Sequence, residues 1–191
     1  SMGVRVPVEI PAFGRHFVLD ALAAFAVGIL LQVDPAAIAE GLAHYTPSGM
    51  RQHIVHASGI TVVEDCYNAS PDSVCATLQG LQYMGDGRKL AVLGDMLELG
   101  DYSEAGHRRC GRQAAELGIP IVAIGPQSRF TAEEAQAHGG TATWYADKES
   151  AAAPLLAQIQ RGDTVLFKAS HGIHMEALMN QVYGVWPKDE K

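Results

Sequence analysis

The sequence has few cysteines and an excess of acidic over basic residues. Its three cysteines, Cys66, Cys75 and Cys110, are odd in number and form no Cys-x-x-Cys pair. They therefore predict neither a disulfide framework nor a zinc site, and this usage is typical of a reducing cytoplasm. The chain carries 14 Lys and Arg against 21 Asp and Glu, a formal net charge of −7. Because a phosphate backbone selects basic surfaces, we expect no nucleic-acid partner.

Long hydrophobic runs and phosphate-binding loops are also missing. The most apolar stretch, residues 18–31, contains Asp20 and Gly28 and falls short of the roughly 20 residues that span a bilayer. We therefore expect a cytoplasmic protein with no membrane segment. Neither GxGxxG nor GxxxxGK[ST] occurs, which disfavours a complete nucleotide-binding domain. His171 and His174 stand apart from other potential ligands, so no metal site is predicted.

From residue 51 onward, strand and helix patterns alternate about five times with short loops. Short apolar runs rich in β-branched residues predict strands, and longer amphipathic stretches predict helices. This alternation predicts an α/β fold with a doubly wound, Rossmann-like parallel sheet. The predicted strands cover residues 53–57, 60–64, 89–93, 120–124, 143–145 and 164–167, and the predicted helices cover residues 71–84, 103–117, 131–138, 148–160 and 173–183.

The first part of the chain has a different pattern. Residues 4–10 predict a short strand, and residues 14–31 and 36–45 predict two helices. One strand and two helices cannot bury a core of their own, so we expect residues 1–48 to be the tail of a larger domain. The Thr-Pro-Ser-Gly stretch at 46–49 marks the boundary, and residues 49–191 form the second domain. We expect residues 187–191 to be a frayed tail.

A polar turn follows the predicted strand at 60–64. Ser70 is placed as the N-cap of the next helix and Pro71 at its first position, so Asp65, Tyr67 and Asn68 lie in a strand-to-helix connection. Ligands bind at this edge of open α/β sheets, where an Asp can accept hydrogen bonds from a ribose. The alternative is that these polar residues only satisfy backbone groups of the turn.

Two stretches resemble the Mur ligase family. Residues 65–73, DCYNASPDS, are similar to the family's Asp-x-Tyr-Asn-Ala-Asn-Pro-x-Ser signature. Residues 92–100, VLGDMLELG, followed by His107, are similar to a second motif of the same family. The resemblance implies a Mur ligase carboxyl-terminal domain, preceded by a partial, mostly helical piece of the central ATPase domain.

The activity implied by this resemblance belongs to bacterial peptidoglycan synthesis. It is the ATP- and Mg²⁺-dependent joining of D-alanyl-D-alanine to UDP-N-acetylmuramoyl-tripeptide. The amino-terminal domain and most of the central domain, with its phosphate loop and metal site, are expected outside this chain. We therefore expect the chain to be inactive alone. The attacking amine belongs to the substrate, so no residue is assigned a catalytic role.

The resemblance also implies binding residues. His16 and Asp20 lie in a stretch similar to the helix that closes the family's central domain, although Phe17 and Asp20 stand where the family has Asn. In the segment that follows Lys168, Ala169 and His171 replace the family's Gly and Arg. The predicted nucleotide-binding residues are Asp20, Arg51, Asp65, Tyr67 and Asn68, and the predicted substrate-binding residues are Asp95, Met96, Glu98, His107, Lys168 and Ser170.

Alternatives stay open for the sites and for the function. Arg51 can be a solvated linker residue, and Asp95, Glu98 and His107 can be ordinary loop and helix polars. A folylpolyglutamate- or cyanophycin-type ligase of the same superfamily is one rival, disfavoured by the motif at residues 92–100. A non-enzymatic α/β binding module is the other.

Overall fold

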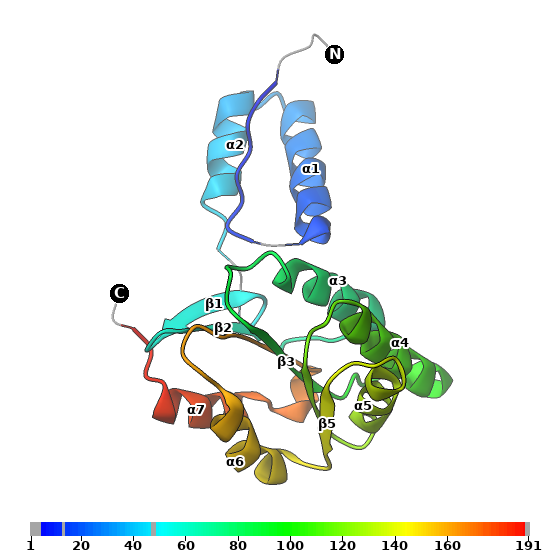
Figure 1. The fold of residues 1–191 in the computed structure, drawn as a ribbon. Coiled ribbons are helices and arrows are strands. Elements are labelled where there is room, and N and C mark those ends of the chain that lie inside the picture. The colour runs from blue at the N-terminus through cyan, green and yellow to red at the C-terminus, as the bar shows by residue number, and fades with distance from the viewer. Residues whose placement is uncertain (1–4, 13, 47–48, 190–191) are drawn as a thin grey trace. The chain divides into compact units, whose positions relative to one another are not determined.

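The computed structural model describes residues 5–12, 14–46 and 49–189. It divides the chain into two compact units, Ser1–Ser48 and Gly49–Lys191, and each is described here by itself (Figure 1). The division falls within the Thr-Pro-Ser-Gly stretch at 46–49, which the sequence marks as the boundary.

The first unit contains two helices, α1 (Arg15–Leu30) and α2 (Pro35–Ala43). Asp34 caps α2 by accepting a hydrogen bond from the Ala36 N–H at 2.9 Å. Residues 5–10 form no strand, so the described part of the predicted strand at 4–10 is wrong. None of the described residues of this unit is buried, and Leu30 is 81% exposed. A strand needs a neighbour for its backbone hydrogen bonds, and the described residues here provide none.

The second unit is built on one six-stranded sheet. Its strands run in the order β1-β2-β6-β3-β4-β5, with β1 antiparallel to β2 and all other pairs parallel. The predicted α/β fold is confirmed, with an antiparallel hairpin strand at one edge. The strands are β1 (His53–Ala57), β2 (Ile60–Asp65), β3 (Lys89–Gly94), β4 (Ile121–Ile124), β5 (Ala142–Tyr145) and β6 (Thr164–Lys168).

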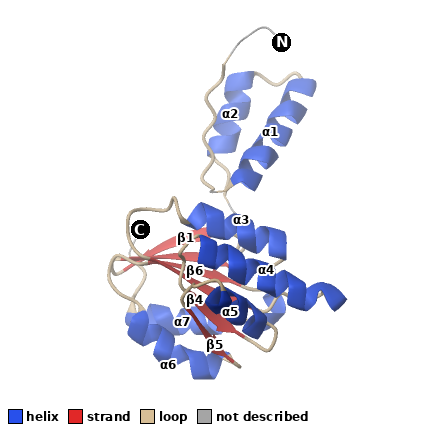
Figure 2. Cartoon of the chain, turned by 45° about the vertical axis from the view of Figure 1, so that its right-hand side comes forward, coloured by secondary structure: helices blue, strands red, loops and turns tan. Residues whose placement is uncertain are grey.

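Helices cover both faces of the sheet, as a doubly wound fold requires. Figure 2 shows α3 (Pro71–Leu81), α4 (Ser103–Glu116) and α5 (Ser128–Ala137) on one face. On the other face lie α6 (Lys148–Gln158) and α7 (Glu176–Val185). Because both faces are covered, the central strands are buried along their length: all five residues of β6 are buried, including the polar Thr164 and Lys168.

Two helices begin away from their predicted starts. The helix predicted at 131–138 begins at Ser128, because the Asp95 carboxylate accepts the Ser128 N–H in the first turn of α5. The helix predicted at 173–183 begins at Glu176, since His171–Ile173 forms a separate 3-10 turn. His174 ends that turn in the left-handed region, with φ of 53°, which interrupts the helix.

The described residues of the carboxyl-terminal segment pack on the sheet edge, so the prediction of a frayed tail is wrong for residues 187–189. Lys188 forms an antiparallel bridge with Ala57 of β1. Asp189 donates its backbone N–H to the His56 carbonyl at 2.9 Å, and its Oδ1 accepts from the Ser58 N–H at 2.8 Å. The segment thereby covers part of the β1 edge, which would otherwise offer unpaired backbone groups.

We expect Asp189→Ala to lower the free energy of unfolding by about 0.5–1 kcal/mol, because the Ser58 N–H loses its acceptor. Urea unfolding measures this change. Asp86→Ala, in an exposed loop, is the matched control and should leave stability unchanged. Equal stability of the two variants would show that the tail contact contributes nothing.

Candidate functional site

The candidate site lies where the chain leaves the sheet in opposite directions. Strand β6 lies between β2 and β3 and continues toward α7 on one face. Its neighbours β2 and β3 continue into α3 and α4 on the opposite face. This reversal is the topological switch point, where open α/β sheets hold ligands beyond the carboxyl ends of their strands. In the register of these strands, Lys168 is aligned with both Asp65 and Leu93.

A buried ion pair occupies this position. Lys168 Nζ lies 2.7 Å from Asp65 Oδ2, and the two side chains are 3% and 9% exposed. Thr77 of α3 donates its hydroxyl to the same oxygen at 3.2 Å, and Lys168 also donates to the Asn68 carbonyl at 3.1 Å. Two side chains predicted to bind different ligands therefore bind each other. Their contacts with ribose or with an anion stay predictions.

An exposed row of aromatic and basic side chains borders the ion pair. The Arg51 guanidinium lies 4.0 Å from the centroid of the Tyr67 ring, and Tyr67 is 47% exposed. The Tyr67 and His171 rings are 6.0 Å apart, and those of His171 and His174 are 5.8 Å apart. A cation stacked on an aromatic face leaves donors and a flat ring available to a planar or anionic ligand. Asn68 lies exposed in the same turn.

The sequence patterns did not mark His171 or His174 as members of this row. His171 follows the end of β6 by three residues, and Tyr67 follows the end of β2 by two, so their positions in the sequence were the signal that both lie at the same sheet edge. Strand pairing was needed to show that β2 and β6 are neighbours.

Asp95 holds the loop after β3 onto α5. Its Oδ1 accepts hydrogen bonds from both the backbone N–H and the hydroxyl of Ser128, each at 2.7 Å. An added Cβ at Gly125, where φ is +113°, would lie 2.6 Å from the Asp95 carboxyl group, so only glycine fits there. A carboxylate is favourable at the start of a helix. Asp95 is buried, and its predicted contact with substrate stays a prediction.

His107 holds the next residue of the same loop. Its side chain is fully buried, Nε2 accepts the Met96 N–H at 3.0 Å, and Nδ1 lies 2.8 Å from the Ser103 carbonyl. This network requires the neutral ring with its proton on Nδ1. Burial lowers the pKa of His107, opposed by its bond to the Ser103 carbonyl and by the charge of Asp95. Met96 is itself buried.

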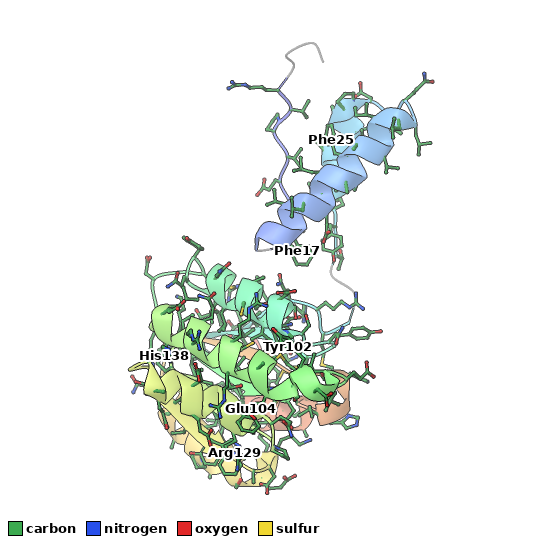
Figure 3. The ribbon with its side chains drawn as sticks, turned by 90° about the vertical axis from the view of Figure 1, so that its right-hand side faces the viewer. Phe17, Phe25, Tyr102, Glu104, Arg129 and His138 are labelled. Atoms are coloured by element: carbon green, nitrogen blue, oxygen red, sulfur yellow. The ribbon has the colours of Figure 1, made fainter. Side chains whose placement is uncertain are left out.

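Ser170 ties this loop to the turn after β6. Its hydroxyl accepts the Leu97 N–H at 2.9 Å, and its own N–H donates to the Asp95 carbonyl at 3.2 Å. Leu97 is 42% exposed, and Glu98 is exposed with φ of 64°, a conformation uncommon for a residue with a Cβ. Tyr102, directly before α4, is also exposed (Figure 3). Of the six predicted substrate-binding residues, Glu98 is thus the exposed one.

Asp20 lies in the first unit, exposed on α1. It borders an apolar cavity of about 230 Å³ together with Phe17, Leu42 and Tyr45; Phe17 is labelled in Figure 3. The predicted nucleotide contact of Asp20 stays a prediction, and the side chain of His16 lies outside what the structure describes.

Two further features are missing from the described residues. Within residues 5–12, 14–46 and 49–189, no three His, Cys, Asp or Glu side chains come together as metal ligands. The described helices include none with both the length and the apolar character to cross a bilayer.

We expect Lys168→Met to lower the free energy of unfolding by about 3–5 kcal/mol, because it leaves the buried Asp65 carboxylate without its cation. Adding Asp65→Asn should recover part of this loss, which a double-mutant cycle by urea unfolding measures. The control pair, Arg109 and Asp72, is exposed and should show a coupling of about 1 kcal/mol or less. Equal coupling in the two pairs would contradict a buried, mutually dependent pair.

We expect stability to fall as the pH is lowered from about 7.5 to about 5.5, partly through His107. Its folded-state pKa lies below the ordinary 6.5, so the unfolded chain binds the proton more readily. This contribution is complete above pH 6.5 and is lost as the pH falls toward the folded-state pKa. His107→Gln should flatten the pH dependence of urea unfolding. Parallel curves for wild type and His107→Gln would contradict this assignment.

Known proteins resemble the chain over nearly its whole length. The UDP-N-acetylmuramoyl-tripeptide–D-alanyl-D-alanine ligase of Bacillus subtilis is 35% identical over 185 residues, which cover 94% of this chain and 40% of that protein. The corresponding Escherichia coli ligase is 34% identical over 178 residues, covering 91% of this chain and 38% of the ligase. The chain thus spans about 40% of the length of these relatives.

Solved structures of such ligases resemble the chain as well. A crystal structure of MurF from Acinetobacter baumannii superposes with a TM-score of 0.84 at 32% identity, covering 93% of this chain and 39% of that one. MurF ligase from Thermotoga maritima in complex with ADP gives a TM-score of 0.75 at 25% identity, covering 91% and 39%. The family described as Mur ligase, glutamate ligase domain, matches residues 50–171. The chain therefore belongs to the Mur ligase family, as its two motifs predicted.

Proposed function

We propose that this chain is the carboxyl-terminal part of an ATP-dependent ligase that joins D-alanyl-D-alanine to UDP-N-acetylmuramoyl-tripeptide. The names of its relatives at 34–35% identity support this substrate pair. They also favour it over the folylpolyglutamate- and cyanophycin-type rivals. Because the chain spans about 40% of those relatives, we propose that the amino-terminal and central domains of the ligase complete the enzyme.

The observation that carries the proposal is the exposed Arg51–Tyr67 pair at the switch point, next to the strand ends that bear Asp65 and Lys168. A guanidinium suits phosphate oxygens, and an aromatic ring suits a base or sugar face. A related ligase has been solved with ADP bound. The role of this edge is then to close on a nucleotide held mainly by the central domain.

The loop after β3 supplies the second half of the proposal. Glu98 presents an exposed carboxylate, the group that pairs with a substrate ammonium, and Leu97 presents an apolar surface beside it. In the proposed reaction, ATP transfers its γ-phosphoryl group to the tripeptide carboxylate, giving an acyl phosphate and ADP. The dipeptide amine then attacks the carbonyl carbon, forms the amide bond, loses a proton and expels phosphate. This domain contributes by holding the amine near that carbon.

We place the ligands for Mg²⁺ in the central domain of the ligase, as the family resemblance implies. We also propose that the ligase acts in the cytoplasm, where ATP is available. The remaining rival, a non-enzymatic binding module, predicts no response to either ATP or the dipeptide.

Titration of the ¹⁵N-labelled chain tests this proposal. We expect ATP to shift the amide resonances of Arg51, Tyr67 and Asn68, and D-alanyl-D-alanine to shift those of Leu97, Glu98 and Ser170. Arg51→Gln should weaken ATP binding about tenfold, the loss of one charge-assisted contact. Arg112→Gln, an exposed change on α4, is the matched control and should not alter it.

Other outcomes would overturn the proposal. Shifts by ATP or dipeptide confined to other residues would reject these site assignments, and no shift by either ligand would reject the proposed ligand contacts of this chain. The chain alone, given ATP, tripeptide and dipeptide, should release no phosphate above background. Phosphate release by the chain alone would contradict the proposal that the amino-terminal and central domains complete the enzyme.

A further inference from the structure

The loop at residues 95–100 is held between two elements that come from distant parts of the sequence. On one side, α4 presents His107 and Cys110, one helical turn apart, to Met96. His107 Nε2 accepts the Met96 N–H at 3.0 Å, and Cys110 Sγ lies 4.0 Å from Met96 Sδ. A Cβ added at Gly106 would lie 3.3 Å from Leu99, so α4 approaches the loop closely. Met96 is thus fixed through both its backbone and its side chain.

On the other side, the turn after β6 fixes the following residue. Ser170 accepts the Leu97 N–H at 2.9 Å, and an added Cβ at Gly172 would lie 3.0 Å from the Leu97 side chain. Two consecutive backbone N–H groups, those of Met96 and Leu97, are therefore bound by side chains of different elements. This arrangement sets the direction in which the chain continues into Glu98, whose φ is 64°. A residue with a Cβ stays in that conformation only when its surroundings impose it.

We propose that His107 is a positioning residue that does not contact the substrate. By accepting the Met96 N–H, it fixes the loop so that Leu97 and Glu98 face the incoming D-alanyl-D-alanine. This inference rests on the proposed function, because it takes the dipeptide as the ligand of the loop. It also changes the role given to His107 in the sequence analysis, from a binding residue to a support for binding residues.

The chemistry of the neutral imidazole suits this role. Nδ1 donates to the Ser103 carbonyl at 2.8 Å within α4, which leaves Nε2 as an acceptor directed at the loop. The ring therefore spans from one helix carbonyl to one loop amide at fixed geometry. Glutamine can supply the same donor and acceptor at similar length, whereas leucine fills the space but leaves the Met96 N–H without its acceptor.

Hydrogen exchange on the ¹⁵N-labelled chain at constant pH tests the hold on the loop. We expect the Met96 amide to exchange at least tenfold faster in His107→Leu than in the wild type, and within about threefold of the wild type in His107→Gln. Ser170→Ala is the matched comparison, and it should speed exchange at Leu97 and leave Met96 nearly unchanged. The Ile124 amide in β4 reports global unfolding and should stay protected throughout. Unchanged Met96 exchange in His107→Leu would overturn the inference.

Dipeptide titration of the same variants tests the consequence for binding. We expect His107→Leu to raise the Kd for D-alanyl-D-alanine at least tenfold, and His107→Gln to restore it to within about threefold. The shifts that ATP causes at Arg51 and Tyr67 should be the same in all three proteins. A purely structural role of His107 would impair both ligands together.

The outcomes separate the inference from the function on which it rests. If the wild-type chain binds the dipeptide and His107→Leu binds it equally well, the positioning role is overturned and the proposed function stands. If the wild-type chain does not bind the dipeptide, the proposed function of the loop fails, and the positioning role toward this ligand fails with it. Should His107→Leu not fold, His107→Asn, whose shorter amide cannot reach both partners, provides the same comparison.

Discussion

The buried ion pair between Asp65 and Lys168 is the contact on which the arrangement of the site depends. It joins the ends of β2 and β6, which are adjacent in the sheet although 103 residues separate the pair in sequence. Thr77 adds a contact from α3 to the same carboxylate. Removing two charges from water is costly, so the pair is stable only while both members and their hydrogen bonds remain together. It therefore fixes the strand ends at the place where a ligand would approach.

The loop after β3 is fixed by a different kind of contact. Asp95, Met96 and Leu97 each use a polar group to bind a separate element: α5 through Ser128, α4 through His107 and the β6 turn through Ser170. The loop has no regular secondary structure at these residues, so side chains satisfy the groups that a helix or strand would have satisfied. Three of the six predicted substrate-binding side chains, those of Asp95, His107 and Ser170, make these contacts within the protein. The side chains of Leu97 and Glu98, by contrast, are exposed to solvent.

The patterns of the sequence predicted the fold well, because the strands of a parallel sheet are marked by short apolar runs and its helices by amphipathic stretches. Predictions failed where a contact between distant residues decides the outcome. The tail beyond Trp186 is polar and proline-containing, which suggests fraying, yet backbone bonds to His56 and a contact with Ser58 hold it. The start of α5 was misplaced because its first turn is anchored by Asp95, a residue 33 positions away.

For the site, the sequence by itself determined the chemistry available at each strand end and the family to which the chain belongs. Asp65 and Tyr67 were identifiable because they are polar residues at the end of an apolar strand, and Glu98 and Lys168 through the resemblance to the family. Only the tertiary structure decided which of these groups bind each other and which remain exposed to a ligand. The physical reason is that strand order is set by packing between distant segments, and this order brings a lysine and an aspartate into one buried pair while leaving tyrosine and arginine exposed.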